Sequence, residues 1–449
     1  MQLTKELFVI PNGEKFILYA PLKRAVAEVN ADMVQLLKRL NAGENLGDLE
    51  EKFEQLRQVG IITDKETPKE TYVPTKDYTP TTVTLIPGFD CNLRCLYCYS
   101  NGGENTEKTM KLDIAKAAID FIIKNALAKG EKQVELGFHG GGEPFLHKNM
   151  SLIKGATDYF RNRAKYYKLQ PAISAVTNGV MNQETIDWVI NNLDEISISF
   201  DGPKDIQNKQ RPTAAMGDSF SPVMQTIKYL ESKKFRYNLR TVITKESASR
   251  MPEIVKFLSS VSSVDHFSFE PLFECGRCQT SKVEAPNPEK YVEYLIKSKE
   301  VASKLGKTVL YACSEVEGVY DYFCGAVGTG FFFVLPDGNV TSCLEVCRKS
   351  DPRADIFMIG KYNFKTKKFV FNKNKMKALK LRSIDNVPGC RDCFAKYNCA
   401  GDCPARCYLE SGNIFDVSKN SDRCKINQEA TKNNLLRKLK GGNINGCKI

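Results

Sequence analysis

Three cysteines in the segment GFDCNLRCLYCYS have the spacing of ligands to one metal centre. Three residues separate Cys91 from Cys95, two separate Cys95 from Cys98, and a strand-like run at 81–86 precedes them. A 4Fe–4S cube takes four ligands, usually all cysteine, so three thiolates leave one iron open to another molecule. A zinc site completed by a distant ligand and three unrelated buried thiols are the competing interpretations.

The cysteine content and the start of the chain favour a metal centre over disulfides. The 449 residues include 16 cysteines, and this length suits two or three domains. A secreted chain would use so many cysteines in disulfides, but the start MQLTKELFVIPNGEKF has no apolar signal region. No stretch has the apolar length needed to cross a bilayer. We therefore expect a cytoplasmic protein, away from membranes, whose reduced cysteines are clustered on metal.

The formal net charge of +12 indicates either a solvated lysine-rich surface or a partner of negative charge. No basic stripe is interleaved with aromatic residues, so we expect no nucleic acid partner. An acidic peptide is the remaining candidate for such a partner.

The elements that would position the three cysteines alternate between strands and helices. Strand-like runs are expected at 81–86, 134–138, 173–177, 196–200, 239–243 and 267–271. Helical patterns lie between them, the clearest at 111–129. Six βα units predict an α/β fold with a parallel sheet, and six are fewer than the eight of a closed barrel. We expect an open, partial (β/α)6 TIM-like barrel over 80–310, with chemistry in the loops that follow its strands.

Two further regions flank this barrel. Residues 1–75 are expected to form a small unit with two strands within 7–19 and helices at 26–40 and 49–59. In 311–449, short strands, glycines and many cysteines predict a region that is stabilised by metal more than by a large apolar core.

Glycines and polar residues follow the predicted strands at one edge of the sheet. The second strand leads into FHGGGEP, where glycines allow close backbone approach to a ligand and Glu143 adds an acceptor. Ser199 and Asp201 share a face at the end of the fourth strand and suit either a ribose or a simple strand cap. Arg240, on the fifth strand, and Arg211, in the preceding loop, suit a carboxylate.

The motifs CNLRCLYC, GGGEP, SISFDG and LRTVIT together resemble the radical S-adenosylmethionine superfamily over about 80–310. The resemblance implies that Cys91, Cys95 and Cys98 hold a 4Fe–4S cluster whose open iron binds S-adenosylmethionine. It assigns contacts with that cofactor to Tyr97 (adenine), Gly141, Gly142 and Glu143 (amino group), Ser199 and Asp201 (ribose) and Arg240 (carboxylate). The cofactor would supply a 5′-deoxyadenosyl radical, and the protein would bind, orient and exclude water.

The later cysteines follow the order Cys324, Gly338-x4-Cys343, Cys390-x2-Cys393-x5-Cys399-x3-Cys403 and Cys424. Zinc ribbons also use Cys-x2-Cys pairs, but the full order resembles the SPASM domain of radical enzymes that modify peptides. The resemblance implies two auxiliary 4Fe–4S clusters, three clusters in all. One would be held by Cys390, Cys393, Cys399 and Cys424, and the other by Cys324, Cys343 and Cys403. The fourth ligand of the second is Cys347, Cys313 or Cys407, or the position is open to a substrate thiolate.

Two motifs keep several interpretations open. Cys275-Gly276-Arg277-Cys278, after the sixth strand, suits a redox pair, a ligand pair or a structural turn. Residues 1–75 resemble, more loosely, the winged-helix-like modules that recognise precursor peptides on enzymes of peptide modification. A sheet edge there would bind a leader peptide as an added strand, and a packing extension of the barrel is the alternative.

We therefore expect a radical enzyme that modifies a ribosomally made precursor peptide by forming a thioether or another crosslink. A small electron donor such as flavodoxin or ferredoxin is the expected partner. One alternative is an anaerobic sulfatase-maturing enzyme, but Leu344 follows Cys343 where that group is expected to carry aspartate. A non-enzymatic iron–sulfur electron carrier is the other alternative.

Overall fold

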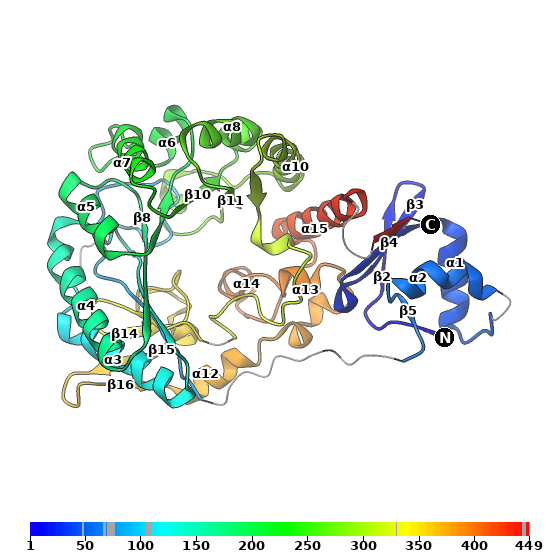
Figure 1. Ribbon diagram of the computed structural model, residues 1–449, viewed down its shortest axis with the longest axis horizontal. Helices are drawn as coiled ribbons and strands as arrows, with labels where there is room; N and C mark the ends of the chain where they lie inside the picture. Colours follow the sequence, from blue (N-terminus) through cyan, green and yellow to red (C-terminus); the bar gives the residue numbers. More distant parts are fainter. Residues whose placement is uncertain are drawn as a thin grey trace. The chain divides into compact units, whose positions relative to one another are not determined.

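The computed structural model describes residues 1–46, 49–65, 69, 77–104, 109–328, 330–441 and 446–448. The chain divides into two compact units, each built from segments that lie apart in the sequence (Figure 1). The barrel unit comprises Pro74–Tyr311 and Cys324–Leu381, and the terminal unit comprises Met1–Val73, Ala312–Phe323 and Arg382–Ile449. The cysteine-rich region expected at 311–449 is thus shared between the units. No helix in the described ranges is long and apolar enough to cross a membrane.

The barrel unit is built on an eleven-stranded sheet of order β12-β11-β10-β9-β8-β7-β6-β13-β14-β15-β16. Seven strands are parallel neighbours: β6 (Thr82–Leu85), β7 (Gln133–Phe138), β8 (Gln170–Thr177), β9 (Glu195–Ser199), β10 (Tyr237–Ile243), β11 (His266–Pro271) and β12 (Thr308–Leu310). The six predicted strands and the open partial barrel are confirmed. The sequence analysis missed β12, which has only three residues.

Helices connect these strands, and the longer ones cover the outer face of the sheet (Figure 1). They are α3 (Leu112–Lys129), α4 (His147–Tyr166), α5 (Gln183–Asn192), α6 (Lys204–Gln210), α7 (Phe220–Ser232), α8 (Met251–Val261), α9 (Cys278–Ser281) and α10 (Pro288–Lys304). Burial alternates along the strands, as β10 shows: Leu239 and Thr241 are buried, whereas Arg240 is exposed. Because successive side chains point to opposite faces, Arg240 lies on the inner face, away from the helices.

The sheet continues beyond β6 into a meander. β13 (Phe333–Val334) pairs in parallel with β6, and β14 (Asn339–Thr341), β15 (Met358–Asn363) and β16 (Lys368–Phe371) follow in antiparallel pairs. Two helices, α11 (Ala354–Phe357) and α12 (Lys373–Lys380), accompany the meander. Cys343 follows β14 directly, so the barrel sheet itself positions this cysteine.

The terminal unit contains a four-stranded sheet of order β17-β4-β3-β2. Its strands are β2 (Phe8–Asn12), β3 (Lys15–Ala20), β4 (Ala25–Val29) and β17 (Gly446–Lys448), and β1 (Gln2–Leu3) pairs with β5 (Ile62–Thr63) beside it. The predicted helix at 26–40 is wrong at its start, because 26–29 belong to β4. Helix α1 (Ala31–Asn41) begins after Asn30, whose side chain caps it by accepting from the Met33 N–H at 2.9 Å. Helix α2 (Glu50–Gln58) matches the second expectation.

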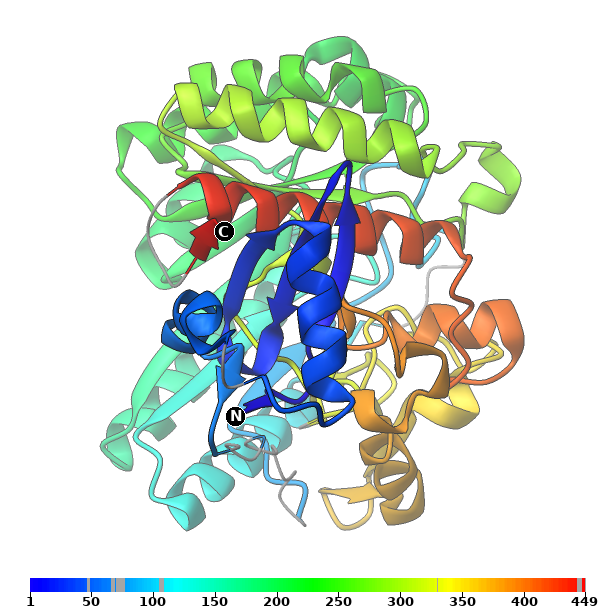
Figure 2. The ribbon, with the colours of Figure 1, turned by 90° about the vertical axis from the view of Figure 1, so that its right-hand side faces the viewer.

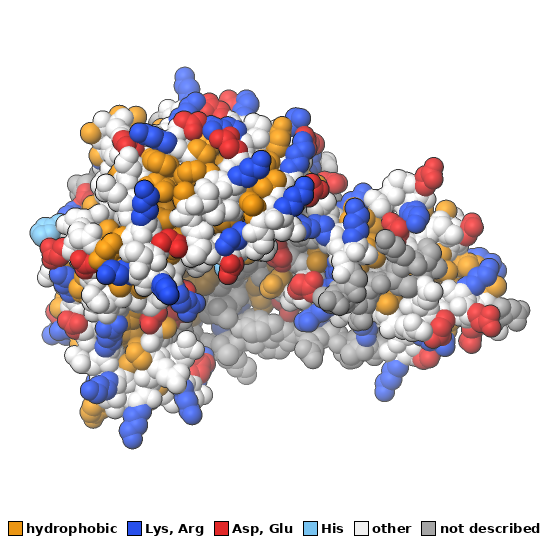
Figure 3. Space-filling model, turned by 45° about the horizontal axis from the view of Figure 1, so that its top comes forward, with side chains coloured by type: hydrophobic (Ala, Val, Ile, Leu, Met, Phe, Trp, Pro, Cys, Tyr) orange, Lys and Arg blue, Asp and Glu red, His pale blue; other side chains and the backbone are white. Residues whose placement is uncertain are grey.

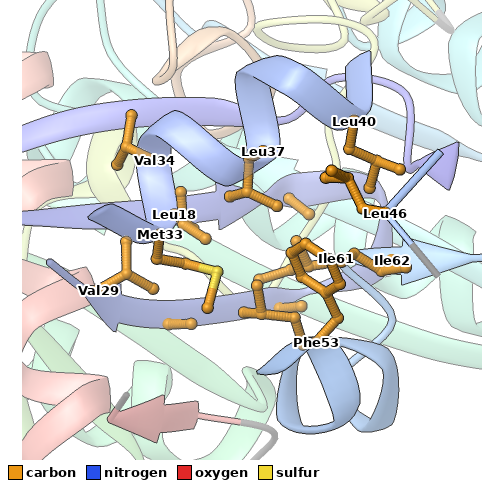
Figure 4. Close-up of a cluster of buried hydrophobic side chains, with 14 residues drawn as sticks. Leu18, Val29, Met33, Val34, Leu37, Leu40, Leu46, Phe53, Ile61 and Ile62 are labelled. Atoms are coloured by element: carbon orange, nitrogen blue, oxygen red, sulfur yellow. The ribbon is translucent and has the colours of Figure 1, made fainter. Parts of the chain in front are cut away.

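Both faces of this small sheet are covered. On one face, α1 and α2 bury a hydrophobic cluster that includes Leu18, Leu37 and Phe53 (Figure 4), and Figure 2 shows α1 lying along the sheet. On the other face, Ile17 and Tyr19 pack with Leu435 of α15 (Asp422–Lys440). Residues from both ends of the chain therefore share one core.

Candidate cofactor site at the carboxyl edge of the barrel sheet

The three-cysteine loop leaves β6 and is fastened to the segment that follows β9. The main-chain N–H of Arg94 donates to Pro212 O at 2.7 Å, and that of Leu96 donates to Gln210 O at 2.9 Å. A β-bridge joins Leu93 to Thr213. These contacts place the cysteines at the carboxyl edge of the sheet, where loop chemistry was predicted.

Each of the three sulfurs has hydrogen-bond donors nearby. Cys91 Sγ faces Leu93 N (3.4 Å) and Asn178 Nδ2 (3.7 Å), Cys98 Sγ faces Gly102 N (3.3 Å), and Cys95 Sγ faces Arg211 Nη1 (3.9 Å). Burial raises the pKa of Cys91 above its usual range and that of Cys95 to about 11. A metal centre needs thiolates, so its binding would release these protons. Three thiols with donors aimed at their sulfurs fit an iron–sulfur cluster, whose properties depend on such hydrogen bonds.

Asp201 anchors this loop from the end of β9. Its carboxylate is fully buried and accepts from Tyr97 Oη, Gln210 Nε2 (2.7 Å) and Val242 N (3.1 Å). It also pairs with Arg211 Nε at 3.0 Å, and the Arg211 guanidinium lies 5.0 Å from the centre of the Tyr97 ring. The sequence predicted a ribose contact for Asp201 and an adenine contact for Tyr97, and both stay predictions. The contacts seen tie these two side chains to the cysteine loop.

The glycines after β7 allow two loops to approach each other. A Cβ on Gly142 would lie 2.0 Å from Asp90 O, and one on Gly141 would lie 2.2 Å from the Phe89 ring. Ser100 Oγ donates to Gly141 O at 2.5 Å. The sequence analysis attributed these glycines to close approach of a ligand, whereas here they make room for the residues just before Cys91.

Glu143 is buried and held by three donors. Its Oε1 accepts from Phe145 N (3.1 Å) and Thr177 Oγ1 (2.7 Å), and its Oε2 accepts from Asn178 N (2.8 Å). Burial raises its pKa to about 7. A carboxylate offers about four lone-pair positions, so Oε2 keeps one position for a cationic group such as an amino group.

Ser199 and Arg240 lie opposite each other on neighbouring strands. They are register partners in the β9–β10 pair, and both belong to the less buried face of their strands. His139 follows β7 at the same edge, and burial, with a smaller effect of the Arg240 charge, lowers its pKa to about 4. The inner face thus offers a hydroxyl, a guanidinium and a neutral imidazole.

The sequence analysis missed Arg277, which braces the cysteine loop from beyond β11. The guanidinium of Arg277 donates to Cys95 O (2.9 Å) and Gly102 O (2.8 Å) and pairs with Glu104 (2.7 Å). Its main-chain N–H donates to Cys98 O at 3.0 Å. Gly276 has φ +58°, and a Cβ there would lie 2.4 Å from Cys98 O. The only sequence signal was its position within Cys275-Gly276-Arg277-Cys278.

This Cys275–Cys278 turn packs beside the loop, and both of its cysteines are buried. Cys278 packs with Cys95 and Tyr97. The interpretations of this motif as a ligand pair or a redox pair stay predictions.

The terminal unit gathers the four cysteines predicted for one auxiliary cluster. Cys390 and Cys393 share a turn in which Cys393 N donates to Cys390 O at 3.1 Å. Burial is the largest cause of the raised pKa of Cys390 and of Cys399. Smaller charge interactions with Cys393, Cys424 and Cys407 also raise the pKa of Cys390, and those with Asp402, Cys313, Cys424 and Cys390 raise the pKa of Cys399. Cys313 and Cys407 thus share this neighbourhood, and the assignment of the four cysteines to one cluster stays a prediction.

The other predicted ligands are distributed over both units. Cys324 and Cys343 belong to the barrel unit and Cys403 to the terminal unit, and this set stays a prediction. Of the candidates for its fourth ligand, Cys347 packs in the barrel unit with Ile86 and Phe89. Within the described ranges, no three His, Cys, Asp or Glu side chains are arranged to hold a single metal ion.

Comparison with known proteins adds independent findings. Residues 85–258 match the model of the Radical SAM superfamily. A cysteine-type anaerobic sulfatase-maturating enzyme of Clostridium novyi is 25% identical over 339 residues, covering 70% of this chain and 85% of that one. A protein of Methanocaldococcus jannaschii described as uncharacterized is 29% identical over 254 residues, covering 56% of this chain and 81% of that one.

Two solved structures are similar in fold. His-tagged anSMEcpe with bound AdoMet superposes with a TM-score of 0.66 at 18% identity, covering 81% of this chain and 95% of that one. Streptococcus suis SuiB bound to the precursor peptide SuiA gives a TM-score of 0.50 at 13% identity, covering 92% of this chain and 98% of that one.

Proposed function

Because residues 85–258 belong to the radical SAM superfamily, we propose that the protein is a radical enzyme that modifies a ribosomally made peptide. The observation that carries this proposal is the cysteine loop, held at the carboxyl edge of a partial barrel by Asp201, Arg211 and Arg277. A fold similar to that of SuiB, whose structure holds a precursor peptide, supports a peptide substrate.

The residues present fit the cofactors of this chemistry. Cys91, Cys95 and Cys98 would hold the 4Fe–4S cluster, and Glu143, through the free position on Oε2, would hold the amino group of S-adenosylmethionine. Bound there, the two cofactors supply a 5′-deoxyadenosyl radical that abstracts hydrogen from the substrate.

The chain's own side chains would orient this cofactor pair. Ser199 and Arg240, as neighbours on the inner face, would bind its ribose hydroxyls and carboxylate. Gly141 and Gly142 would act mainly by keeping the cysteine loop close to Glu143.

The later cysteines would hold the two auxiliary clusters. One cluster would be held by Cys390, Cys393, Cys399 and Cys424, which all belong to the terminal unit. A substrate thiolate at the second cluster would favour thioether formation, and a carbon–carbon crosslink is the other product. The edge strand β2 of the terminal unit would bind the leader peptide as an added strand.

Sulfatase maturation is the second candidate function. Relatives of that name cover up to 70% of this chain, which favours it. Leu344, where an aspartate would be expected after Cys343, argues against it.

One anaerobic experiment tests the proposal. Reconstituted protein with dithionite and S-adenosylmethionine should release 5′-deoxyadenosine, and Cys95→Ala should release none. Addition of a cysteine-containing precursor peptide should give a product that lacks two hydrogens, whereas a sulfatase peptide should be returned unchanged. Zinc in place of iron at Cys91, Cys95 and Cys98 would overturn the proposal.

A further inference from the structure

The β15–β16 hairpin and α12 carry lysines without acidic residues between them. Residues 361–381 include eight lysines and no aspartate or glutamate. Six of these lysines are exposed, and we call them the lysine face: Lys361, Lys365, Lys367, Lys368, Lys373 and Lys377. On the molecular face drawn in Figure 3, by contrast, Lys and Arg side chains are interspersed with Asp and Glu.

The charge of the lysine face is little compensated by its surroundings. Within the described ranges none of its six side chains forms an ion pair, and the nearby Asp355 lies 4.0 Å from Lys375, which is outside the set. The six lysines equal half of the formal net charge of +12. Such a one-signed surface attracts partners of opposite charge and speeds their association.

Apolar side chains stand among these lysines. Phe364 is 58% exposed and Val370 is 51% exposed, and β16 is the last strand of the sheet. An exposed aromatic side chain and an exposed aliphatic side chain, surrounded by lysines, have the composition of a transient protein interface. The surface thus suits a protein partner better than a small anion.

A row of packed aromatic rings leads from this surface towards the cysteine loop. Ring centres are 5.0 Å apart for Phe364–Tyr362, 5.4 Å for Tyr362–Phe369 and 5.3 Å for Phe369–Phe332. The next residue, Phe333, packs against the cluster of buried side chains that contains Phe89 and contacts Tyr99. Both of these residues flank the three cysteines. Ring contacts as far as Phe332, and the peptide bond from Phe332 to Phe333, therefore connect the lysine face with the packing around the cysteine loop within a single unit.

We propose that the lysine face docks a small acidic electron-transfer protein that reduces the enzyme. This inference rests on the proposed function, because only a reducible cluster needs such a donor. In the step, the donor is oxidised by one electron and the cluster at Cys91, Cys95 and Cys98 is reduced by one electron, with no bond or proton transferred. An acidic segment of the substrate peptide would also be attracted to the lysine face. The row of aromatic rings that leads from this face towards the cysteine loop favours the electron donor as its partner.

The test compares two reductants on one charge-reversed variant. In Lys365→Glu/Lys368→Glu/Lys373→Glu, release of 5′-deoxyadenosine driven by reduced flavodoxin, used as the acidic probe, should fall by about tenfold or more at low salt. Release driven by dithionite should equal that of the wild type. Added sodium chloride should slow the flavodoxin reaction of the wild type and have little effect on that of the variant.

The matched control reverses three exposed lysines near the outer helices α7 and α8: Lys228→Glu/Lys233→Glu/Lys256→Glu. It makes the same change in net charge and should keep the flavodoxin rate within about twofold.

The outcomes separate this inference from the proposed function. An equal loss in both variants, or no loss in the first, would overturn the docking site. If the lysine-face variant is reduced by flavodoxin at the wild-type rate but binds the substrate peptide more weakly, the docking site would also be overturned, because the lysine face would then bind the substrate. Wild-type protein that makes no 5′-deoxyadenosine even with dithionite would contradict the proposed function instead.

Discussion

At the scale of single residues, the buried Arg277 side chain braces the cysteine loop through two main-chain oxygens, those of Cys95 and Gly102. We expect Arg277→Gln to lower the iron bound at Cys91, Cys95 and Cys98 and to raise the KM for S-adenosylmethionine about tenfold, since charge-assisted hydrogen bonds contribute about 1.5–3 kcal/mol each. Arg277→Lys, which keeps the charge, should restore part of the affinity. Iron analysis and 5′-deoxyadenosine kinetics measure both effects.

Arg250 supplies the control, because it pairs with Asp205 and Glu253 near the surface. Exposed pairs contribute little, so Arg250→Gln should bind iron and cofactor as the wild type does. Equal behaviour of Arg277→Gln and Arg250→Gln would contradict the bracing role.

His139 should make the fold sensitive to moderate acid. Its pKa is lowered from 6.5 to about 4 in the folded protein, so the unfolded chain takes up a proton first as the pH falls. The contribution of the neutral His139 imidazole to the free energy of unfolding is therefore fully present above about pH 6.5. It is lost as the pH falls from about 6.5 to about 4. Because the ring is partly exposed, we expect a loss of about 1 kcal/mol between pH 7 and pH 5.

Urea unfolding of metal-free protein at these two pH values measures the effect. His139→Asn keeps an acceptor for Gly140 N, which donates to His139 Nδ1 at 2.8 Å. This variant should lose correspondingly less stability on acidification. An identical pH dependence of both proteins would refute the assignment.

The types of the site residues were more predictable than their contacts. The spacing of Cys91, Cys95 and Cys98 predicts a cluster, because local spacing is written in the sequence, and this assignment stays a prediction. Other contacts join segments that lie apart in the chain. Asp201 accepts a hydrogen bond from Tyr97 and pairs with Arg211, and Arg277 donates to Cys95 O. No local pattern carries that information.

At the scale of elements, the close approach of two loops depends on Gly142. We expect Gly142→Ala to separate the β7 loop from the cysteine loop, because the added methyl would lie 2.0 Å from the main-chain oxygen of Asp90. Iron content and binding of S-adenosylmethionine should both fall by more than tenfold, in line with the cost of overpacking.

Gly88→Ala provides a matched control in the loop that follows β6 and leads to the three cysteines. Its Cβ would meet only Asn149 Oδ1, at 3.7 Å, which is ordinary contact. This variant should keep wild-type iron content. A functional Gly142→Ala protein would show that the two loops have room to move apart.

Secondary structure was predictable where the hydrophobic residues of a segment followed one clear periodicity, that of a strand or that of a helix. The parallel strands β6 to β11 were expected from their apolar runs, and the open barrel followed from their number. The segment 26–40 was misassigned because Val26, Ala27 and Val29 fit the apolar face of a helix as well as a strand, and only Asn30 marks the start of the helix. Strand β12 was missed because three residues carry too little pattern.

At the scale of the whole molecule, the two ends of the chain form one core. Tyr19 Oη and the Asn398 side chain hydrogen-bond at 3.2 Å, and Asn398 Nδ2 also donates to Glu315 O at 2.9 Å. Deletion of 1–73 would expose Leu435 and Val316. We therefore expect the deletion to make 382–441 sensitive to protease and to remove the iron held by Cys390, Cys393, Cys399 and Cys424.

Tyr19→Phe is the mild counterpart of this deletion. It removes one hydrogen bond, worth about 1 kcal/mol, and should leave the iron content unchanged. A truncated chain that retains both iron and protease resistance would contradict the shared core. Leader-peptide binding is accordingly better tested by point substitutions in β2 than by truncation.

The pairing of β4 with β17 has a consequence for biosynthesis. The first strands leave the ribosome early, but their last partner follows only after roughly 20–85 s at ordinary translation rates. Until then the first sheet keeps an open edge and an uncovered apolar face, a state that chaperones commonly shield. The cysteines of the terminal unit come late in the sequence, from Cys313 onward, so a cluster there would be inserted only after the first sheet has gained its last strand, as a late event.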